Sequence, residues 1–209
     1  MKISSIRTLQ NNSNKYSVYI DGHYALNVSA SILLKQKLSI GLDISKERLD
    51  ELMNLSAQEE AYASALNFIS IRPRSVWEMR QYLKKKAVPA EYITYILNKL
   101  SNIKLLDDYS FTRAWVDNRQ ALRPTSRRRL EQELRQKHVE EKILRSVLDE
   151  YTDNDLRALR HMITKKRKLS TYKNDTVKLT SYLVHQGFSY DDVKQALDDE
   201  HLINGDRGF

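Results

Sequence analysis

The chain has no cysteine, only three prolines and only five glycines. Without cysteine it can form no disulfide and no zinc–thiolate site, and we expect a reducing, cytoplasmic location. The glycines stand at positions 22, 41, 187, 205 and 208, which excludes the glycine loops that cradle phosphates in P-loop and dinucleotide-binding proteins. No apolar run approaches the ~20 residues of a transmembrane helix, and the first residues lack a signal-peptide hydrophobic segment, so we expect no membrane partner.

Catalytic and metal-binding patterns are also missing from the sequence. The five histidines stand far apart, without the spacing of metal ligands. A Glu-x-Lys pair within Glu140-Glu141-Lys142 is similar to those of nuclease sites, but it falls in a predicted helix, where residues two apart face different directions. We therefore expect no catalytic residue, no metal and no cofactor, and a protein that is not an enzyme.

Six apolar positions recur in three copies about fifty residues apart, at helical spacing, which is typical of one supersecondary unit used in tandem. The positions are Met79, Leu83, Val88, Ile93, Ile96 and Leu97, then Leu130, Leu134, Val139, Leu144, Val147 and Leu148, then Leu179, Leu183, Phe188, Val193, Ala196 and Leu197. The pattern predicts a mainly α, elongated protein of three tandem three-helix repeats. Such an array offers a surface for a partner more than a pocket for a substrate.

The first 28 residues follow a different pattern. Apolar residues alternate with polar ones on both sides of Asp21-Gly22, which indicates a β-hairpin. A plain two-residue turn would put the two apolar sets, the second of which begins at Tyr24, on opposite faces, so we expect a bulge or a three-residue loop. Ile3 and Ile6 favour a third strand. Short helices over 30–36 and 45–54 complete a small β-containing domain.

Helix starts are well marked from Ser56 onward, because Ser56–Glu59 and Ser75–Glu78 both have the form of a capping box. The expected helices are 57–70, 76–86 and 90–100, then 108–120, 127–137 and 140–151, then 154–168, 174–186 and 190–200. Gly187 suits the left-handed residue that closes a helix, whereas Ala87 and His138 at the same phase predict tighter or differently closed hinges. The expected domains are 1–55, repeats at 56–102, 103–152 and 153–201, and a tail at 202–209.

The formal charge of +8 is unevenly distributed. The segments 72–86, 119–129 and 157–168 hold six, five and six Lys or Arg residues against a single acid, Glu78. Residues 188–200 instead carry five acids against Lys194. Because the basic segments fall at similar phases of the repeat, we expect one positive stripe and a polyanionic or acidic partner. The alternative is a merely solvated face.

Two local features point to contact with a partner. The helix expected at 127 opens with Arg127-Arg128-Arg129, which places cations at its positive dipole end, and a phosphate or an acidic protein surface would offset that cost. Trp77 lies partly off the apolar stripe of its helix, so it contacts either a partner or the rest of the chain. Phe111 and Trp115, four residues apart, are interpreted as core.

Arg72-Pro73-Arg74-Ser75, with Glu78 and Leu83, resembles the R-x-R-S-x-x-E-L-x-x-x-L segment of the RecX regulatory proteins. The segment 105–111 (LLDDYSF), with Trp115-Val116 and Arg119, resembles the next motif of that family, and 21–25 (DGHYA) is similar to the N-terminal extension of its longer Gram-positive members. The chain departs from the family at Lys86-Ala87 and Lys137-His138, where Lys-Gly is usual, and at 123–126 (RPTS), where a glycine is usual.

The resemblance implies a non-enzymatic modulator of the RecA recombinase, built of tandem three-helix repeats. Members of the family are understood to lie along the groove of the RecA–DNA filament and to inhibit its recombinase and ATPase activities, in recombination, DNA repair and the SOS response. The expected partners are the RecA filament and the phosphate backbone of single- and double-stranded DNA, contacted by a monomer.

The residues expected to bind RecA or DNA are Arg72, Arg74, Trp77, Arg80, Lys84, Lys85, Arg119, Arg123, Arg127, Arg128 and Arg129. Arg72, Arg74 and Arg119 also match motif positions of the family. Either Arg72 or Arg119 could instead be a structural partner of Asp107, Asp108 or Glu78. Two other functions stay open: a sequence-specific DNA-binding protein of helix-turn-helix type, and an adaptor that recognises an acidic protein surface.

Overall fold

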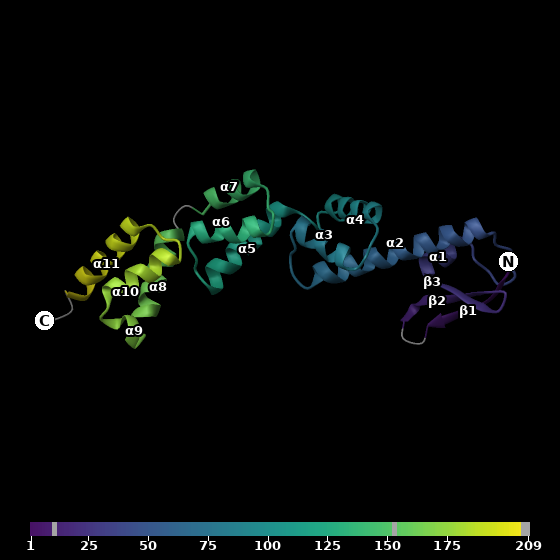
Figure 1. The fold of residues 1–209 in the computed structure, drawn as a ribbon, viewed down its shortest axis with the longest axis horizontal. Coiled ribbons are helices and arrows are strands. Elements are labelled where there is room, and N and C mark those ends of the chain that lie inside the picture. The colour runs from purple at the N-terminus through teal and green to yellow at the C-terminus, as the bar shows by residue number, and fades with distance from the viewer. Residues whose placement is uncertain (10–11, 152–153, 206–209) are drawn as a thin grey trace. The chain divides into compact units, whose positions relative to one another are not determined.

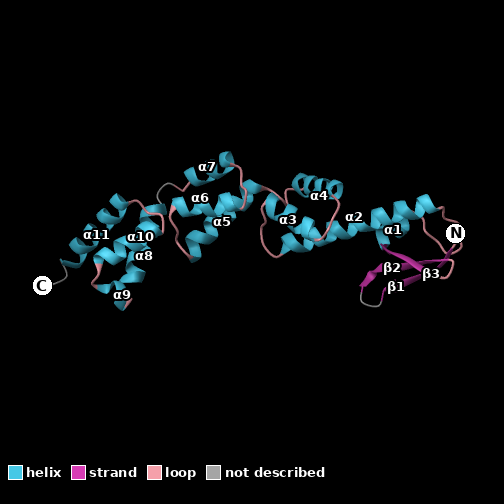
Figure 2. Ribbon diagram, viewed as in Figure 1, coloured by secondary structure: helices cyan, strands magenta, loops and turns pink. Residues whose placement is uncertain are grey.

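The computed structural model describes residues 1–9, 12–151 and 154–205 (Figure 1). The chain forms two compact units, one with residues 1–70 and 83–96, the other with residues 71–82 and the chain from residue 97 on. Among the described residues, strands occur only near the N-terminus and the other regular elements are helices (Figure 2). The predicted mainly α fold with a small β-containing part is therefore confirmed.

The N-terminal sheet has three antiparallel strands in the order β1-β2-β3. They are β1 (Ile3–Leu9), β2 (Asn12–Ile20) and β3 (His23–Ser29). The turn between β2 and β3 consists of Asp21 and Gly22, both with positive φ, as a tight two-residue hairpin requires. The predicted hairpin and third strand are both confirmed.

A bulge sets the register of the hairpin. Val18 pairs with Leu26, whereas the next residue, Tyr19, pairs with Tyr24, so Ala25 is the extra residue. The bulge brings Val18 and Leu26 to one face, where both are buried, as predicted. It leaves Tyr24 on the other face, 57% exposed and edge-on to Tyr19, so its predicted place in the buried set was wrong.

The sheet packs against helices of the same unit. Helix α1 (Ala30–Lys35) follows β3 directly, and α2 (Lys46–Ser70) contacts β3 and runs unbroken through 25 residues. The predicted helix start at Ser56 was wrong, because no Pro or Gly interrupts this stretch and the Ser56 hydroxyl donates to the Asn27 carbonyl of β3. The proposed boundary between residues 55 and 56 lies inside α2. The core of this unit consists of Ile3, Val18, Ile20, Leu26, Val28, Ile32, Leu38, Ile44 and Leu52.

The three copies follow in sequence. After α2 come α3 (Val76–Lys85) and α4 (Ala90–Asn102), then α5 (Asp108–Leu122), α6 (Arg127–Gln136) and α7 (Glu141–Asp149), then α8 (Asn154–Arg167), α9 (Ser170–Lys173), α10 (Thr176–His185) and α11 (Tyr190–Gly205). The short α9 was not predicted. Helix α11 extends beyond its predicted end into the expected tail, of which residues 206–209 lie outside the described part, as does the expected boundary between residues 152 and 153.

The repeated apolar positions form the cores of the copies. All eighteen are buried except Val88, which is half-buried. Those of the second copy pack with Phe111 and Val116, and those of the third copy with Leu159 and Ile163. The repeat read from the sequence therefore identifies the core.

The hinge before the last helix has the same closing hydrogen bond in all three copies. Ala87, His138 and Gly187 all have left-handed φ angles, of 56°, 54° and 95°. In each hinge the following residue donates its N–H to the carbonyl five residues earlier, at 3.1, 3.3 and 3.4 Å. The expected difference at Ala87 and His138 was therefore wrong, because the same backbone hydrogen bond closes all three hinges.

Candidate functional site

Two buried serines, Ser75 and Ser126, each cap a helix and also connect one copy to the next. Ser75 accepts the Glu78 N–H at 3.1 Å, as the predicted capping box requires, and donates its hydroxyl to the Lys137 carbonyl at 3.0 Å. Ser126 accepts the Arg129 N–H at 3.3 Å and donates to the Gln186 carbonyl at 2.7 Å. We call the contacts of residues 72–78 with the second copy the first joint. The contacts of residues 123–129 with the third copy form the second joint.

An aspartate completes each joint in the same way. Asp108, at the start of α5, accepts the Val76 N–H at 2.8 Å, and Asp155, at the start of α8, accepts the Arg127 N–H at 2.6 Å. Each carboxylate lies at the N-terminus of the preceding copy's middle helix, where an anion is favoured. Burial nevertheless raises the pKa of both side chains above the ordinary aspartate value.

The first joint contains a closed ion-pair cluster around Glu78. Its carboxylate receives two hydrogen bonds from Arg72, at 3.0 and 3.1 Å, and one from Lys137 of the second copy at 2.7 Å. Only 9% of the Glu78 side chain is exposed. Burial alone would raise the pKa of Glu78, but the hydrogen bonds and charges of Arg72 and Lys137 together lower it to about 2.

The second joint has no such carboxylate among the described residues. Arg129 stands three residues after Ser126, as Glu78 stands three after Ser75, and Arg123 corresponds likewise to Arg72. Lys137 is replaced by Gln186, whose amide oxygen accepts a hydrogen bond from Arg129. The acid that neutralises two cations in the first joint has thus become a cation itself in the second, beside Arg123.

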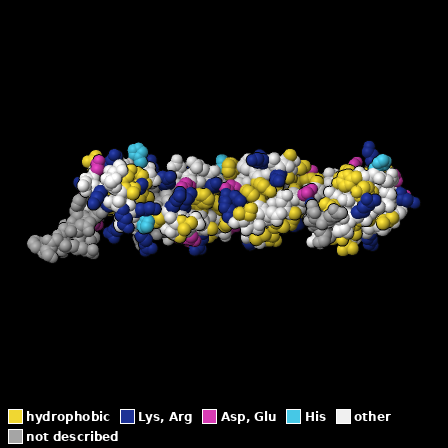
Figure 3. Space-filling view, turned by 90° about the horizontal axis from the view of Figure 1, so that it is seen from below, with side chains coloured by type: hydrophobic (Ala, Val, Ile, Leu, Met, Phe, Trp, Pro, Cys, Tyr) yellow, Lys and Arg dark blue, Asp and Glu magenta, His cyan; other side chains and the backbone are white. Residues whose placement is uncertain are grey.

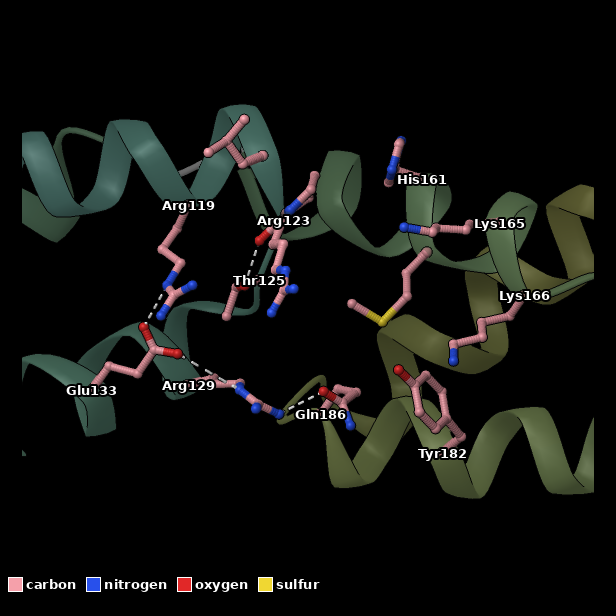
Figure 4. A pocket seen from close by; sticks show the side chains of 13 residues that line it. Arg119, Arg123, Thr125, Arg129, Glu133, His161, Lys165, Lys166, Tyr182 and Gln186 are labelled. Atoms are coloured by element: carbon pink, nitrogen blue, oxygen red, sulfur yellow. Dashed lines mark hydrogen bonds and ion pairs between the residues drawn. The ribbon is translucent and has the colours of Figure 1, made fainter.

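A cavity of about 410 Å³ opens at the second joint, and we call it the basic pocket. It lies between α5 and α6 of the second copy and α8 and α10 of the third (Figure 4). Five cations and a single carboxylate line it, with Arg119, Arg123 and Arg129 on one side and Lys165 and Lys166 on the other. The full lining is Arg119, Leu122, Arg123, Pro124, Thr125, Arg129, Glu133, His161, Met162, Lys165, Lys166, Tyr182 and Gln186.

The first joint has a smaller cavity in the corresponding place. It measures about 170 Å³ and is lined by Arg72, Pro73, Phe111, Ala114, Trp115 and Asn118. Counted from the joint aspartates, Ala114, Trp115 and Asn118 correspond to His161, Met162 and Lys165 of the basic pocket. Since Arg72 is the only cation there and is paired with Glu78, the accumulation of positive charge distinguishes the second joint from the first.

Comparison with known proteins identifies the family. Models of the "Regulatory protein RecX N-terminal domain", the "RecX, first three-helix domain" and the "RecX, second three-helix domain" match residues 1–45, 61–100 and 107–148. The regulatory protein RecX of Listeria welshimeri is 30% identical over 200 residues, which cover 94% of this chain and 74% of that protein. The chain belongs to the RecX family.

Other RecX proteins give the same result. The regulatory protein RecX of Halalkalibacterium halodurans is 29% identical over 205 residues, which cover 94% of this chain and 77% of that protein. A crystal structure titled as that of regulatory protein RecX shares the fold with a TM-score of 0.72 at 25% identity, and the match covers 94% of this chain and 98% of that one. The family resemblance read from the motifs at residues 72–83 and 105–119 is therefore confirmed.

Arg119, one of the RecX motif positions, forms an internal ion pair. Its Nε lies 2.8 Å from Glu133, which also accepts the Trp115 indole N–H at 3.0 Å. The structural alternative left open for one of the two motif arginines holds for Arg72, which pairs with Glu78. Arg119 pairs with an acid that was not among the three considered, Glu133 on the neighbouring helix α6.

Arg127 likewise forms ion pairs within this RecX chain. Its guanidinium contacts Asp149 at 2.6 Å and Glu131 at 3.4 Å, and the hydrogen bond that it donates to Asp149 is the main reason that its pKa is raised. Together with Asp155 at the helix N-terminus, these acids offset the charge at the start of α6. No outside anion is needed at Arg127, contrary to the expectation from the sequence.

The other predicted residues lie on α3, just before it, and on α6. Trp77 is half-buried and stacks on His138 with ring centroids 4.4 Å apart, which favours its structural alternative. Burial lowers the pKa of the half-buried Arg74, while Arg128 is exposed but does not line the basic pocket. Arg80, Lys84 and Lys85 are exposed on α3, and the two lysines belong to the first compact unit.

The structure adds residues of the third copy to the candidate site. His161, Lys165, Lys166 and Tyr182 line the basic pocket but were not selected from the sequence, although residues 157–168 stood out as basic. The spacing from Asp108 to Asp155 carries the missing signal, because it aligns the first helices of the two copies. No helix among the described residues is long and apolar enough to cross a membrane.

Proposed function

We propose that this RecX-family protein is a non-enzymatic regulator that binds the RecA–DNA filament and inhibits the recombinase and ATPase activities of RecA. Family membership supports the regulatory role, since the relatives are named regulatory proteins. The basic pocket supports contact with a polyanion, because five cations and one carboxylate share a cavity of about 410 Å³. The pocket is the observation that carries the DNA-binding part of the proposal.

The contacts in the pocket favour phosphate recognition without sequence preference. Arginine presents a planar fork of donors that suits phosphate oxygens, and lysine acts as a point charge. Lys166 lies 4.2 Å from the Tyr182 ring centroid, so a cation already occupies a face of this ring where a base would stack. Binding through such groups releases counterions and weakens steeply with salt.

A helix-turn-helix protein that reads base sequence fits the chain less well. Recognition helices place their N-terminal residues against base edges in the major groove. The last helix of each copy instead begins with acids: Glu91 in α4, Glu141 in α7, and Asp191 and Asp192 in α11. Carboxylates there would be repelled by DNA phosphates, which favours sequence-independent contact through the basic pocket.

The test is RecA-driven ATP hydrolysis on single-stranded DNA, titrated with this protein at two salt concentrations. We expect inhibition at less than one copy per RecA subunit, weaker at the higher salt. Unchanged hydrolysis with active RecA would contradict the proposal. Retention of DNA that differs strongly between sequences would favour the helix-turn-helix alternative, and no retention at low salt would favour the adaptor.

One face of the chain carries mixed charge. On the face drawn in Figure 3, Lys and Arg side chains lie among apolar and acidic ones. The continuous positive stripe and the contribution of Arg80, Lys84 and Lys85 therefore stay predictions. Charge reversal of these three residues, with filament binding as the measurement, tests them separately from the pocket.

A further inference from the structure

The two joints differ in how their cations are neutralised. In the first joint the Glu78 carboxylate lies between a cation of its own copy, Arg72, and a cation of the next copy, Lys137, at 3.0 and 2.7 Å. One buried anion thereby links two copies of the repeat. Trp77 adds a stacked contact on His138 across the same joint.

The second joint lacks both of these links. Its equivalents of Glu78 and Lys137 are Arg129 and Gln186, and its equivalents of Trp77 and His138 are Arg128 and Gly187. The single carboxylate of the basic pocket, Glu133, is engaged by Arg119 at 2.8 Å, within the second copy. No described acid therefore bridges the second and third copies inside the pocket.

Cations of both copies nevertheless face the same cavity. Figure 4 shows Arg119, Glu133, Arg129 and Gln186 linked in a row, with Arg123 beside them and Lys165 reaching from α8 toward Arg123. Compared with the first joint, Arg129 stands in place of the central anion and Gln186 in place of Lys137, and Lys165 and Lys166 of the third copy add cations to the cavity.

We propose that a phosphate group of a bound nucleic-acid backbone enters the basic pocket, takes over the bridging role that Glu78 has in the first joint, and thereby fixes the third copy against the second. Arg123 and Arg129 hold it from the second copy and Lys165 from the third. The ligand acts as the missing bridging anion, so binding and the ordering of the joint are coupled. The inference rests on the DNA binding proposed above and names both its site and its structural consequence.

The absence of native cysteine makes this coupling directly measurable. Spin labels on Ser146→Cys in α7 and Gln195→Cys in α11, both exposed positions, report the distance between the second and third copies. We expect a broad distance distribution for the full chain alone and a narrow one with an oligo-dT strand. Inorganic pyrophosphate is expected to narrow it only at higher concentration. Narrowing by pyrophosphate without narrowing by the oligonucleotide would overturn the nucleic-acid assignment.

A double variant rebuilds the first joint inside the second. Arg129→Glu with Gln186→Lys reproduces the Glu78–Lys137 pair. The label distance is expected to be narrow without any ligand, and oligo-dT affinity is expected to fall about tenfold, since a charge-assisted contact is lost. Lys142→Gln, an exposed position outside the pocket with the same net charge change, is expected to behave as the native chain.

The outcomes separate this inference from the proposed function. If RecA is inhibited and DNA binds, but the label distance is the same with and without oligo-dT, the bridging role is wrong and the regulatory function stands. If oligo-dT narrows the distance but RecA hydrolysis is unaffected, the bridging role stands and the regulatory function is wrong. A double variant that binds oligo-dT as tightly as Lys142→Gln would overturn the pocket as the site.

Discussion

Glu78 and Arg129 occupy the same position in successive repeats, and the charge there is reversed. Each follows a capping serine by three residues. Each also contacts the side chain of the residue in the next copy, Lys137 or Gln186, whose carbonyl accepts that serine's hydroxyl. Around Glu78 the joint is electrically closed, with a carboxylate between two cations. Around Arg129 it is open to an outside anion. The reversal of charge at this position is the central difference between a structural joint and a candidate binding site.

Glu78→Gln is expected to destabilise the protein at neutral pH by about 3 kcal/mol, because Arg72 and Lys137 lose their shared anion. The pKa of Glu78 falls from 4.5 to about 2 on folding, so its contribution is complete above pH 4.5 and is lost as the pH falls toward 2. Chemical unfolding at pH 7 and near pH 2 is the measurement. An equal difference between native chain and variant at both pH values would contradict this.

At the aspartates of the two joints, Asp108 and Asp155, loss of the charge is expected to be tolerated, whereas loss of the oxygen that accepts the backbone N–H is not. Burial raises the pKa of Asp155, so its ionised form is stabilised less in the folded chain than in the unfolded one. The resulting loss of folding stability grows as the pH rises through the pKa of the unfolded state. Asp155→Asn still offers an oxygen to the Arg127 N–H and should remain within about 0.5 kcal/mol of the native chain. Asp155→Ala should cost about 1–2 kcal/mol, since that N–H is left unpaired. Unfolding by urea at pH 7 ranks the two, and equal losses would rule out the acceptor role.

Opposite effects are expected at two hinges that are closed by the same type of backbone hydrogen bond. Gly187 has a φ of 95°, and a Cβ there would lie 2.6 Å from the Ser126 hydroxyl, so Gly187→Ala should destabilise by about 2 kcal/mol. Ala87 has a φ of 56°, which glycine adopts without strain, so Ala87→Gly should stabilise by about 0.5–1 kcal/mol. Thermal unfolding of the two variants decides. Stabilisation by Gly187→Ala would contradict the close approach of Ser126.

Removing pocket cations is expected to flatten the salt dependence of DNA binding. Each phosphate contact to a single strand contributes about 0.7 to the slope of log affinity against log salt, so Arg123→Gln with Lys165→Gln should reduce it by about 1.4. Lys142→Gln should leave the slope as it is. Fluorescence anisotropy of a labelled oligo-dT at four salt concentrations provides the slopes. Equal slopes for the pocket variant and the control would place the DNA contacts elsewhere.

Core positions were predictable from the sequence because they obey a local rule. Residues such as Leu83, Leu134 and Leu183 recur at helical spacing, and burial follows from that periodicity alone. The continuous helix α2 was not predictable in this way. The segments that begin at Ser56 and Ser75 both have serine at the first position and glutamate at the fourth. Only the hydrogen bond from Ser56 to Asn27 distinguishes them, because it belongs to a serine that lies within a helix.

The candidate site depended on contacts that sequence does not reveal. Runs of like charge suggested that Arg127 was available to a partner, yet Asp149, 22 residues away, neutralises it. Conversely, Lys165 lines the same cavity as Arg123 and Arg129 only because the fold places α8 at the second joint. Charge counted along the chain therefore located the basic segments but not the cations that face a common cavity.

The most direct test compares RecA-driven ATP hydrolysis in the presence of three proteins: the native chain, Arg123→Glu with Lys165→Glu, and Lys142→Glu. All three are titrated at one low salt concentration, and circular dichroism confirms that each is folded. The native chain and Lys142→Glu are expected to inhibit equally, whereas the pocket variant should need at least about tenfold more protein, since two phosphate contacts become repulsive. Equal inhibition by all three would contradict a regulatory role for the basic pocket.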